Sequence, residues 1–167
     1  MLDDFFMRRA IGLAYRGAGR VAPNPMVGAV LVHEGRVIGE GWHALYGDVH
    51  AEVACLESVS AAARHLVRES TMYVTLEPCP MCAGAILNSR IARVVFGARD
   101  KRLGALGSTY DILEGNPINR VVAVEGPAME EECLEMLKGF FREIRARKKA
   151  DPGEISGDSG GVAAALD

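Results

Sequence analysis

Apolar residues recur at helical spacing near both ends of the chain. The first stretch carries its apolar side chains three or four positions apart, at Phe5, Phe6, Ala10, Leu13 and Ala14. This spacing predicts an opening helix over residues 4–17, because Gly17-Ala18-Gly19 then interrupts the pattern. A second and longer helical pattern runs from Ala128 to about Lys149. It predicts a closing helix.

Between these helices the chain alternates extended and helical patterns. The β-branched run Val27–His33, the turn Glu34-Gly35 and the extended run Arg36–Trp42 predict a hairpin. Further strands are expected at Met72–Leu76, Ile91–Gly97 and Val121–Val124, and further helices from about Ala51 to Arg64 and from Pro80 onward. Strands that alternate with helices favour an α/β protein with three α/β/α layers and a five-stranded mixed sheet.

Length and composition indicate one domain. The chain has 167 residues, 49% of them apolar, which suffices for one core over residues 1–150. Residues 151–167 are rich in Gly, Ser, Ala and Asp, and we expect them to form a disordered tail. No apolar run approaches the ~20 residues of a membrane span. Asp3 and Asp4 do not fit the basic start of a signal peptide, so we expect a cytoplasmic protein.

Two short motifs carry the candidate chemistry: His50-Ala51-Glu52 and Pro78-Cys79-Pro80-Met81-Cys82. His50, Cys79 and Cys82 supply one imidazole and two thiolates, which are three ligands for a tetrahedral Zn²⁺ with the fourth position left for water. The two cysteines fall at a predicted helix start, where the helix dipole favours thiolate. Three ligands and an open position are typical of catalytic zinc.

Glu52 distinguishes this pattern from simpler cysteine sites. A lone C-x-x-C is also found in redox pairs and structural zinc knuckles, but a Cys₄ site needs two more paired cysteines. Cys55 and Cys133 are isolated in apolar stretches and are expected in the core. Glu52 lies two residues from His50 and can act on the zinc-bound water as general acid and base. The pattern H-x-E…P-C-x-x-C is that of zinc-dependent base deaminases, which are hydrolases.

The second half of the domain resembles one deaminase family in particular. The segments Thr75–Ala85, Ser89–Ile91 and Val94–Asp100, continued by 104–107 and 140–149, are similar to the bacterial tRNA adenosine deaminases. This resemblance implies a cytidine-deaminase-like fold, a homodimer with one zinc per subunit, and conversion of the wobble adenosine of tRNA to inosine. It also implies that an anticodon stem-loop is the partner, with its target base flipped into the zinc pocket.

The first half resembles a different deaminase. Val21–Val30 and Gly39–Glu52 are similar to the pyrimidine deaminase domain of riboflavin biosynthesis, and His43 stands where the tRNA enzymes usually carry Asn. This resemblance implies that Asn24 and His43 contact the substrate, and we expect Ala51 and Pro78 beside them. It leaves open a small-molecule deaminase that acts on a pyrimidine nucleotide or on a free nucleobase or nucleoside.

The spacing of the cysteines favours the tRNA hypothesis over the riboflavin one. Only Pro80 and Met81 separate Cys79 from Cys82, whereas the riboflavin family usually spaces its two cysteines more widely. A third hypothesis, a non-catalytic zinc-binding or RNA-binding module, fits poorly because such a site has no use for Glu52 as a proton shuttle.

The closing helix carries a candidate RNA-binding surface. Acidic residues lie near its start and five cations crowd its end, at Arg142, Arg145, Arg147, Lys148 and Lys149. This order also suits the helix dipole of a solvated helix. Five cations within eight positions exceed what one C-terminal turn needs, so we expect phosphate contacts here. The net charge of −3 neither requires nor excludes nucleic acid.

Overall fold

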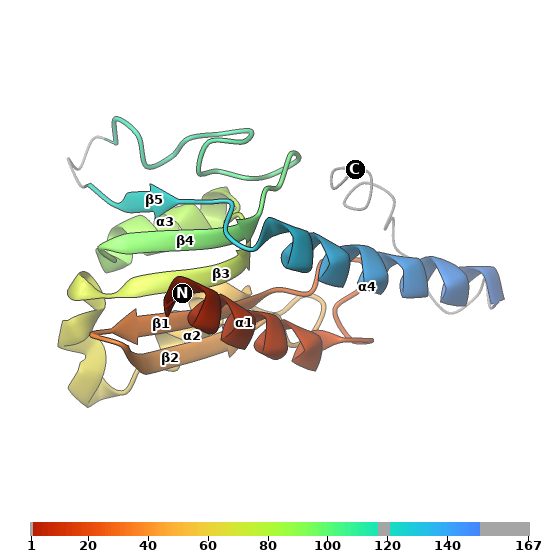
Figure 1. The fold of residues 1–167 in the computed structure, drawn as a ribbon, viewed down its shortest axis with the longest axis horizontal. Helices are drawn as coiled ribbons and strands as arrows, with labels where there is room; N and C mark the ends of the chain where they lie inside the picture. The colour runs from red at the N-terminus through yellow and green to blue at the C-terminus, as the bar shows by residue number, and fades with distance from the viewer. Residues whose placement is uncertain (1, 117–120, 151–167) are drawn as a thin grey trace.

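The computed structural model describes residues 2–116 and 121–150 and contains a five-stranded mixed sheet in the order β2-β1-β3-β4-β5 (Figure 1). The strands are β1 (Gly28–His33), β2 (Arg36–Trp42), β3 (Thr71–Leu76), β4 (Arg93–Ala98) and β5 (Ala123–Glu125). β1 pairs antiparallel with β2 and β3, whereas β3, β4 and β5 run parallel. The predicted tail, 151–167, lies outside the described residues.

Helices cover both faces of the sheet and give the three predicted layers. They are α1 (Leu2–Ala14), α2 (Ala51–Glu57), α3 (Pro80–Ser89) and α4 (Glu130–Ala150). Helices α1 and α4 lie on one face and α2 and α3 on the other, and α4 runs on past the sheet (Figure 1). The three-layer α/β/α architecture with a mixed sheet is therefore confirmed.

Alternation along the strands divides the core in two. Val30 and Tyr73 belong to the apolar cluster under α1 and α4, whereas Leu31 and Val74 belong to the cluster under α2 and α3. This is the period of two that places successive side chains on opposite faces of a sheet. Parallel β3 and β4 are buried at five of their six positions, because helices cover both of their faces.

The helix predicted over 51–64 is wrong in its second half. α2 ends at Glu57, and a 3₁₀ helix follows at Ala61–Glu69. The hydroxyl of Ser58 donates to the carbonyl of Cys55 and accepts the backbone N–H of Glu40, at 2.7 and 2.8 Å. A serine that bonds neighbouring backbone in this way competes with the helix ladder. Ser58 thereby ends α2 and ties it to β2.

The remaining elements differ from the prediction mainly in their bounds. The hairpin, α1, α3 and α4 form where the pattern placed them, with the last turn before Gly17 as a 3₁₀ turn. β5 begins at Ala123, two residues later than predicted, and its three residues are exposed. It is held to β4 by Arg93, which donates to Glu125 at 2.8 and 2.6 Å and also to Asp3 of α1.

Candidate active site

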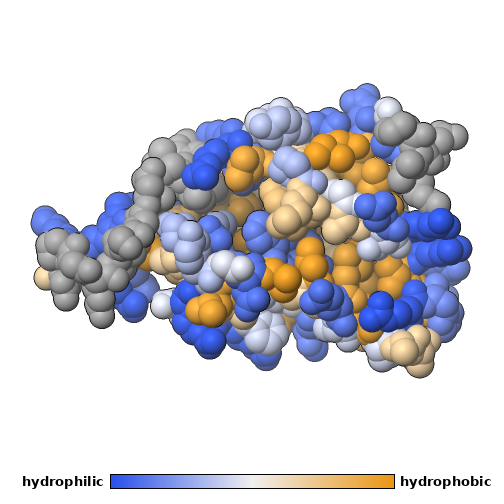
Figure 2. All heavy atoms as spheres, turned by 180° about the vertical axis from the view of Figure 1, so that it is seen from behind, coloured by the Kyte–Doolittle hydropathy of each residue, from blue (hydrophilic) through white to orange (hydrophobic). Residues whose placement is uncertain are grey.

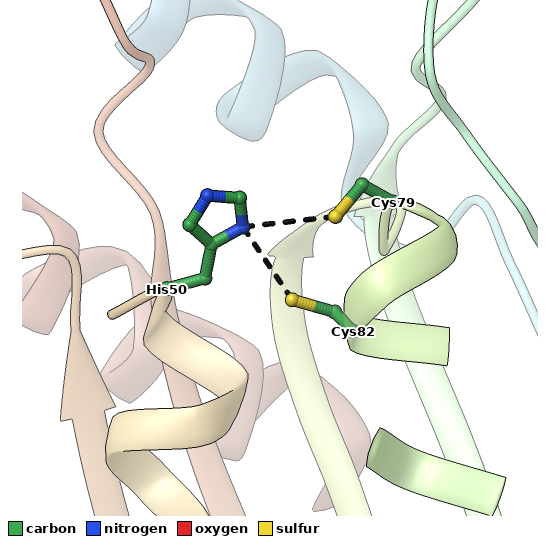
Figure 3. Close-up of side chains that lie close together, drawn as sticks. All are labelled: His50, Cys79 and Cys82. Carbon is green, nitrogen blue, oxygen red and sulfur yellow. Dashed lines mark hydrogen bonds between the residues drawn. The ribbon is translucent and has the colours of Figure 1, made fainter. Parts of the chain in front are cut away.

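Three potential ligands converge where α2 and α3 begin. His50 is the residue before α2, and Cys79 is the residue before α3, with Cys82 in the first turn of that helix. The Nδ1 atom of His50 lies 3.7 Å from Sγ of Cys79 and 3.5 Å from Sγ of Cys82 (Figure 3). All three ligand atoms lie within 4.8 Å of one another. The structure therefore brings together the three predicted ligands.

These separations match a zinc tetrahedron. With Zn–N near 2.0 Å and Zn–S near 2.3 Å, a tetrahedral angle places the nitrogen and each sulfur about 3.5 Å apart. The observed distances of 3.5 and 3.7 Å agree closely with that value. One imidazole and two thiolates are also a donor set that suits Zn²⁺. His50, Cys79 and Cys82 can thus hold the ion without rearrangement.

Hydrogen bonding favours a thiolate at Cys79 and a thiol at Cys82. Hydrogen bonds from Cys82 and His50 lower the pKa of Cys79 to about 4. The pKa of Cys82 is raised, because Cys82 donates to the Cys79 thiolate and is itself buried. The hydrogen bond between His50 and Cys79 raises the pKa of His50. A divalent cation would replace these protons, so metal binding would release them.

Glu52 lies in the first turn of α2 and faces the same cavity. Its side chain is 4% exposed, and burial raises the pKa of its carboxyl group, partly opposed by a backbone hydrogen bond. A carboxyl group whose pKa is raised can hold a proton as well as release one, which suits general acid and base chemistry. The helix start that supplies His50 thus also supplies the predicted proton shuttle.

A small cavity of about 110 Å³ opens beside the three ligands. Its lining includes the predicted residues Asn24, His43, His50, Ala51, Glu52 and Cys79, together with Pro25, Val27, Leu76, Glu77, Asp100, Arg102 and Leu103. Pro78 does not line it; its carbonyl instead accepts the backbone N–H of Ala105 at 2.8 Å. Pro78 is thus buried without lining this cavity, whereas we expected it beside Asn24 and His43.

Asn24 and His43 form a hydrogen-bonded pair inside the cavity. His43 is 3% exposed, and its Nδ1 lies 3.0 Å from the carbonyl oxygen of Val49. Because a carbonyl can only accept, Nδ1 carries the hydrogen, and in this tautomer Nε2 is an acceptor. Nδ2 of Asn24 lies 3.2 Å from that Nε2 and donates to it. This leaves Oδ1 of Asn24 to accept a hydrogen bond from a ligand.

Sequence reasoning missed the part of the cavity wall that is formed by residues after β4. Asp100, Arg102 and Leu103 line the cavity but follow β4, far in sequence from both motifs. A signal was present, because the carboxyl ends of neighbouring parallel strands meet at one sheet edge, where α/β proteins bind ligands. β3 ends directly before the cysteine motif, and β4 ends directly before this segment.

The predicted RNA-binding cations lie apart from the cavity, at the end of α4. Arg142, Arg145, Arg147 and Lys149 are exposed and Lys148 is half-buried. A side chain at Gly19 would place its Cβ 3.6 Å from the guanidinium of Arg147. Gly19 precedes the segment that carries Asn24, so α4 approaches the wall on that side. In the part of the chain that the structure describes, no helix is long and apolar enough to cross a membrane.

Comparison with known proteins agrees with this geometry. Residues 1–98 match the model of the cytidine and deoxycytidylate deaminase zinc-binding region. The tRNA-specific adenosine deaminase of Haemophilus influenzae is 42% identical over 155 residues, which are 89% of this chain and 88% of that protein.

Two solved structures are similar to the whole fold. One, from a study of A-to-I editing by tRNA:A34 deaminases, is 31% identical with a TM-score of 0.67, over 80% of this chain and 99% of that chain. The other, a diaminohydroxyphosphoribosylaminopyrimidine deaminase/reductase from Thermotoga maritima, is 36% identical with a TM-score of 0.69. The match covers 87% of this chain but spans only 42% of the Thermotoga chain.

Proposed function

This chain belongs to the cytidine and deoxycytidylate deaminase family, and we propose that it hydrolyses adenosine to inosine at the wobble position of tRNA. The observation that carries the proposal is the relative named tRNA-specific adenosine deaminase, 42% identical over nearly the whole of both chains. The close spacing of Cys79 and Cys82 supports the same choice. We propose that one Zn²⁺ per subunit is held by these two thiolates and His50.

The chain's own residues can move the protons of this reaction. Zinc in such a site lowers the pKa of a bound water from 15.7 to about 7, so that hydroxide is available at neutral pH. We propose that Glu52 takes the proton of the attacking water and delivers it to the ring nitrogen next to the amine-bearing carbon. Glu52 then takes the remaining proton of the added hydroxyl group and gives it to the departing amine, so that adenosine and water give inosine and ammonia.

The cavity constrains how the substrate enters. Because Glu52 and His50 line this cavity, a target base would have to leave its stack and enter the cavity to reach them. Oδ1 of Asn24 would accept a hydrogen bond from the base or its ribose, and His43 would keep that amide in place. The five cations at the end of α4 would contact phosphates of the stem, outside the cavity.

We further propose that two copies of the chain pair through the α2–α3 face. Figure 2 shows the molecule from behind, and apolar side chains gather there among polar ones. Met81, in the first turn of α3, is 60% exposed. An apolar surface of this kind suits contact with a second copy. Such a dimer would act on cytoplasmic tRNA.

The test is inosine formation in a synthetic anticodon stem-loop with a wobble adenosine, using zinc-loaded protein. We expect conversion of that adenosine and none in a stem-loop with guanosine at the same position. Affinity for the stem-loop should fall steeply as salt rises, because phosphate contacts release counterions. Absence of inosine under saturating enzyme would contradict the proposed function.

A second candidate is a deaminase of a ribosylated pyrimidine phosphate. The Asn24–His43 pair favours it, because the tRNA enzymes usually carry Asn where His43 stands, and the Thermotoga neighbour is structurally as close as the tRNA one. Ammonia release from such a nucleotide, without inosine formation in the stem-loop, would favour this candidate. The His43→Asn variant provides a further comparison, since it should retain activity on tRNA only if tRNA is the substrate.

A further inference from the structure

Glu77 is a buried carboxylate that the proposed chemistry does not use. It lies directly after β3, two residues before Cys79, and is 2% exposed. Among the described residues no Lys or Arg pairs with it. Its oxygens instead accept the backbone N–H groups of Asp100, Leu106 and Ser108, at 3.2, 3.0 and 3.1 Å, and the hydroxyl of Ser108. Four donors from one segment therefore satisfy this charge.

The same segment, 100–108, is pressed closely against the cysteine motif. A Cβ at Gly104 would lie 2.5 Å from the carboxyl carbon of Glu77, so only glycine fits there. The next residue, Ala105, donates its N–H to the carbonyl of Pro78. Glu77 and Pro78 thus hold the segment on the turn that carries Cys79, and the distance between segment and metal ligands is fixed.

This segment presents a cation and an apolar side chain to the cavity. Arg102 and Leu103 both line it, and both side chains are exposed to solvent at its mouth. The carboxylate of Asp100 is engaged by the backbone N–H groups of Arg102 and Leu103, at 2.9 and 3.1 Å. Within the described part of the chain, the guanidinium of Arg102 forms no ion pair. It is therefore available to an anionic ligand.

We propose that Arg102 and Leu103, carried by segment 100–108, form a phosphate-binding wall of the active site, in which Arg102 contacts a phosphate attached to the target nucleoside and Glu77 is the positioning residue. The proposal rests on the proposed deaminase function. Because Arg102 lines the cavity and is also exposed to solvent, it can reach a sugar or phosphate attached to a base inside the cavity. Guanidinium is well matched to phosphate because it can donate two parallel hydrogen bonds. Leu103 then packs beside the nucleoside.

The phosphate could be that of an RNA backbone or of a mononucleotide. Both sources share the chemistry that Arg102 would recognise. They are separated by measuring two ligands: the anticodon stem-loop, and a pyrimidine ribonucleoside 5′-monophosphate beside its unphosphorylated nucleoside.

The first test compares Arg102→Ala with Lys101→Ala. Lys101 is an exposed cation next in sequence that does not line the cavity, so it controls for loss of one charge. We expect Arg102→Ala to weaken stem-loop binding about tenfold and to lower the slope of log K against log salt by about 0.7. KM should rise with kcat nearly unchanged. Lys101→Ala should change binding less than twofold.

The second test combines Glu77→Gln with Arg102→Ala in a double-mutant cycle. Gln keeps the size of the side chain but turns one acceptor into a donor that faces backbone N–H groups. We expect Glu77→Gln alone to weaken stem-loop binding about tenfold with zinc content unchanged. In the Arg102→Ala background it should cost less than threefold, because its effect passes through Arg102. Equal costs in both backgrounds would show a structural role instead.

The outcomes separate this inference from the proposed function. A parent protein that makes no inosine but loses affinity for the mononucleotide on Arg102→Ala contradicts the tRNA function and supports the phosphate wall. Unchanged binding of both the stem-loop and the mononucleotide by Arg102→Ala would overturn the inference, whatever the activity. If Glu77→Gln does not fold, Ser108→Ala removes a single donor and should give a smaller loss of the same kind.

Discussion

Replacing Glu52 by Gln separates proton transfer from structure. The side chain is 4% exposed and lines the cavity, and Gln has nearly the same shape. Burial raises the pKa of the parent carboxyl group, which means that the folded protein stabilises its charged form poorly. The neutral amide avoids that cost, so we expect the free energy of unfolding to change by no more than about 1 kcal/mol.

The effect on turnover should be large. A positioned general acid or base contributes roughly 10²- to 10⁴-fold, and Glu52 is proposed to serve both water activation and amine departure. We therefore expect kcat to fall by at least about 10³-fold, which corresponds to about 4 kcal/mol of transition-state stabilisation. The stem-loop should still bind, because Glu52 lies inside the cavity and contributes nothing to phosphate contacts.

The assay is single-turnover inosine formation at saturating enzyme, with zinc content and thermal unfolding measured on the same samples. Glu57→Gln is the matched control, since it makes the same change at an exposed position of the same helix. A Glu52→Gln rate within tenfold of the parent would refute the assigned role. Loss of zinc from this variant would instead indicate that Glu52 is a ligand.

Three further predictions test the metal, the backbone and the charge network. Chelation of zinc should lower the melting temperature by about 10 °C, because the ion joins the starts of α2 and α3; calorimetry with and without chelator measures this. Gly12→Ala should stabilise α1 by about 0.5 to 1 kcal/mol in urea unfolding, since an added Cβ meets nothing within 4 Å. The hydrogen bond from Arg93 lowers the pKa of Asp3 from 3.8 to about 2, so its stabilisation is present above about pH 4 and lost as pH falls through about 2. Because Asp3 is 40% exposed, we expect this hydrogen bond to contribute only about 1 kcal/mol to the free energy of unfolding. Measured against pH, the free energy of unfolding of Asp3→Asn should lack this change.

The local parts of this molecule were predictable from its sequence. The hairpin and α3 follow from β-branched runs and from Pro80, which is favoured in a first helical turn. Two of the predicted zinc ligands, Cys79 and Cys82, lie in one short motif, and the third, His50, lies with Glu52 in another. Adjacent residues at a helix start keep nearly the same relative positions in any fold, so the motif itself carries the geometry.

The parts that depend on contacts across the chain were not predictable. The apolar spacing after Glu57 continues as if the helix ran on, but Ser58 binds the backbone of β2 and ends it. No local pattern places Arg102 in the same cavity as His50, because that placement depends on β3 and β4 lying side by side in parallel. Glu77 likewise looks in the sequence like an isolated charge before a proline.

The residues of the candidate active site fall into the same two groups, those that a local motif positions and those that contacts across the chain position. The proposed metal ligands and Glu52 come from helix starts and would determine the reaction, whereas Asn24, His43 and Arg102 come from loops joined by tertiary contacts and would determine what enters. This division explains why two deaminase resemblances coexist in one chain while the zinc chemistry is common to both. It follows that exchanging His43 or Arg102 should change substrate preference at constant zinc content, and that exchanging Cys82 should abolish turnover of every substrate alike.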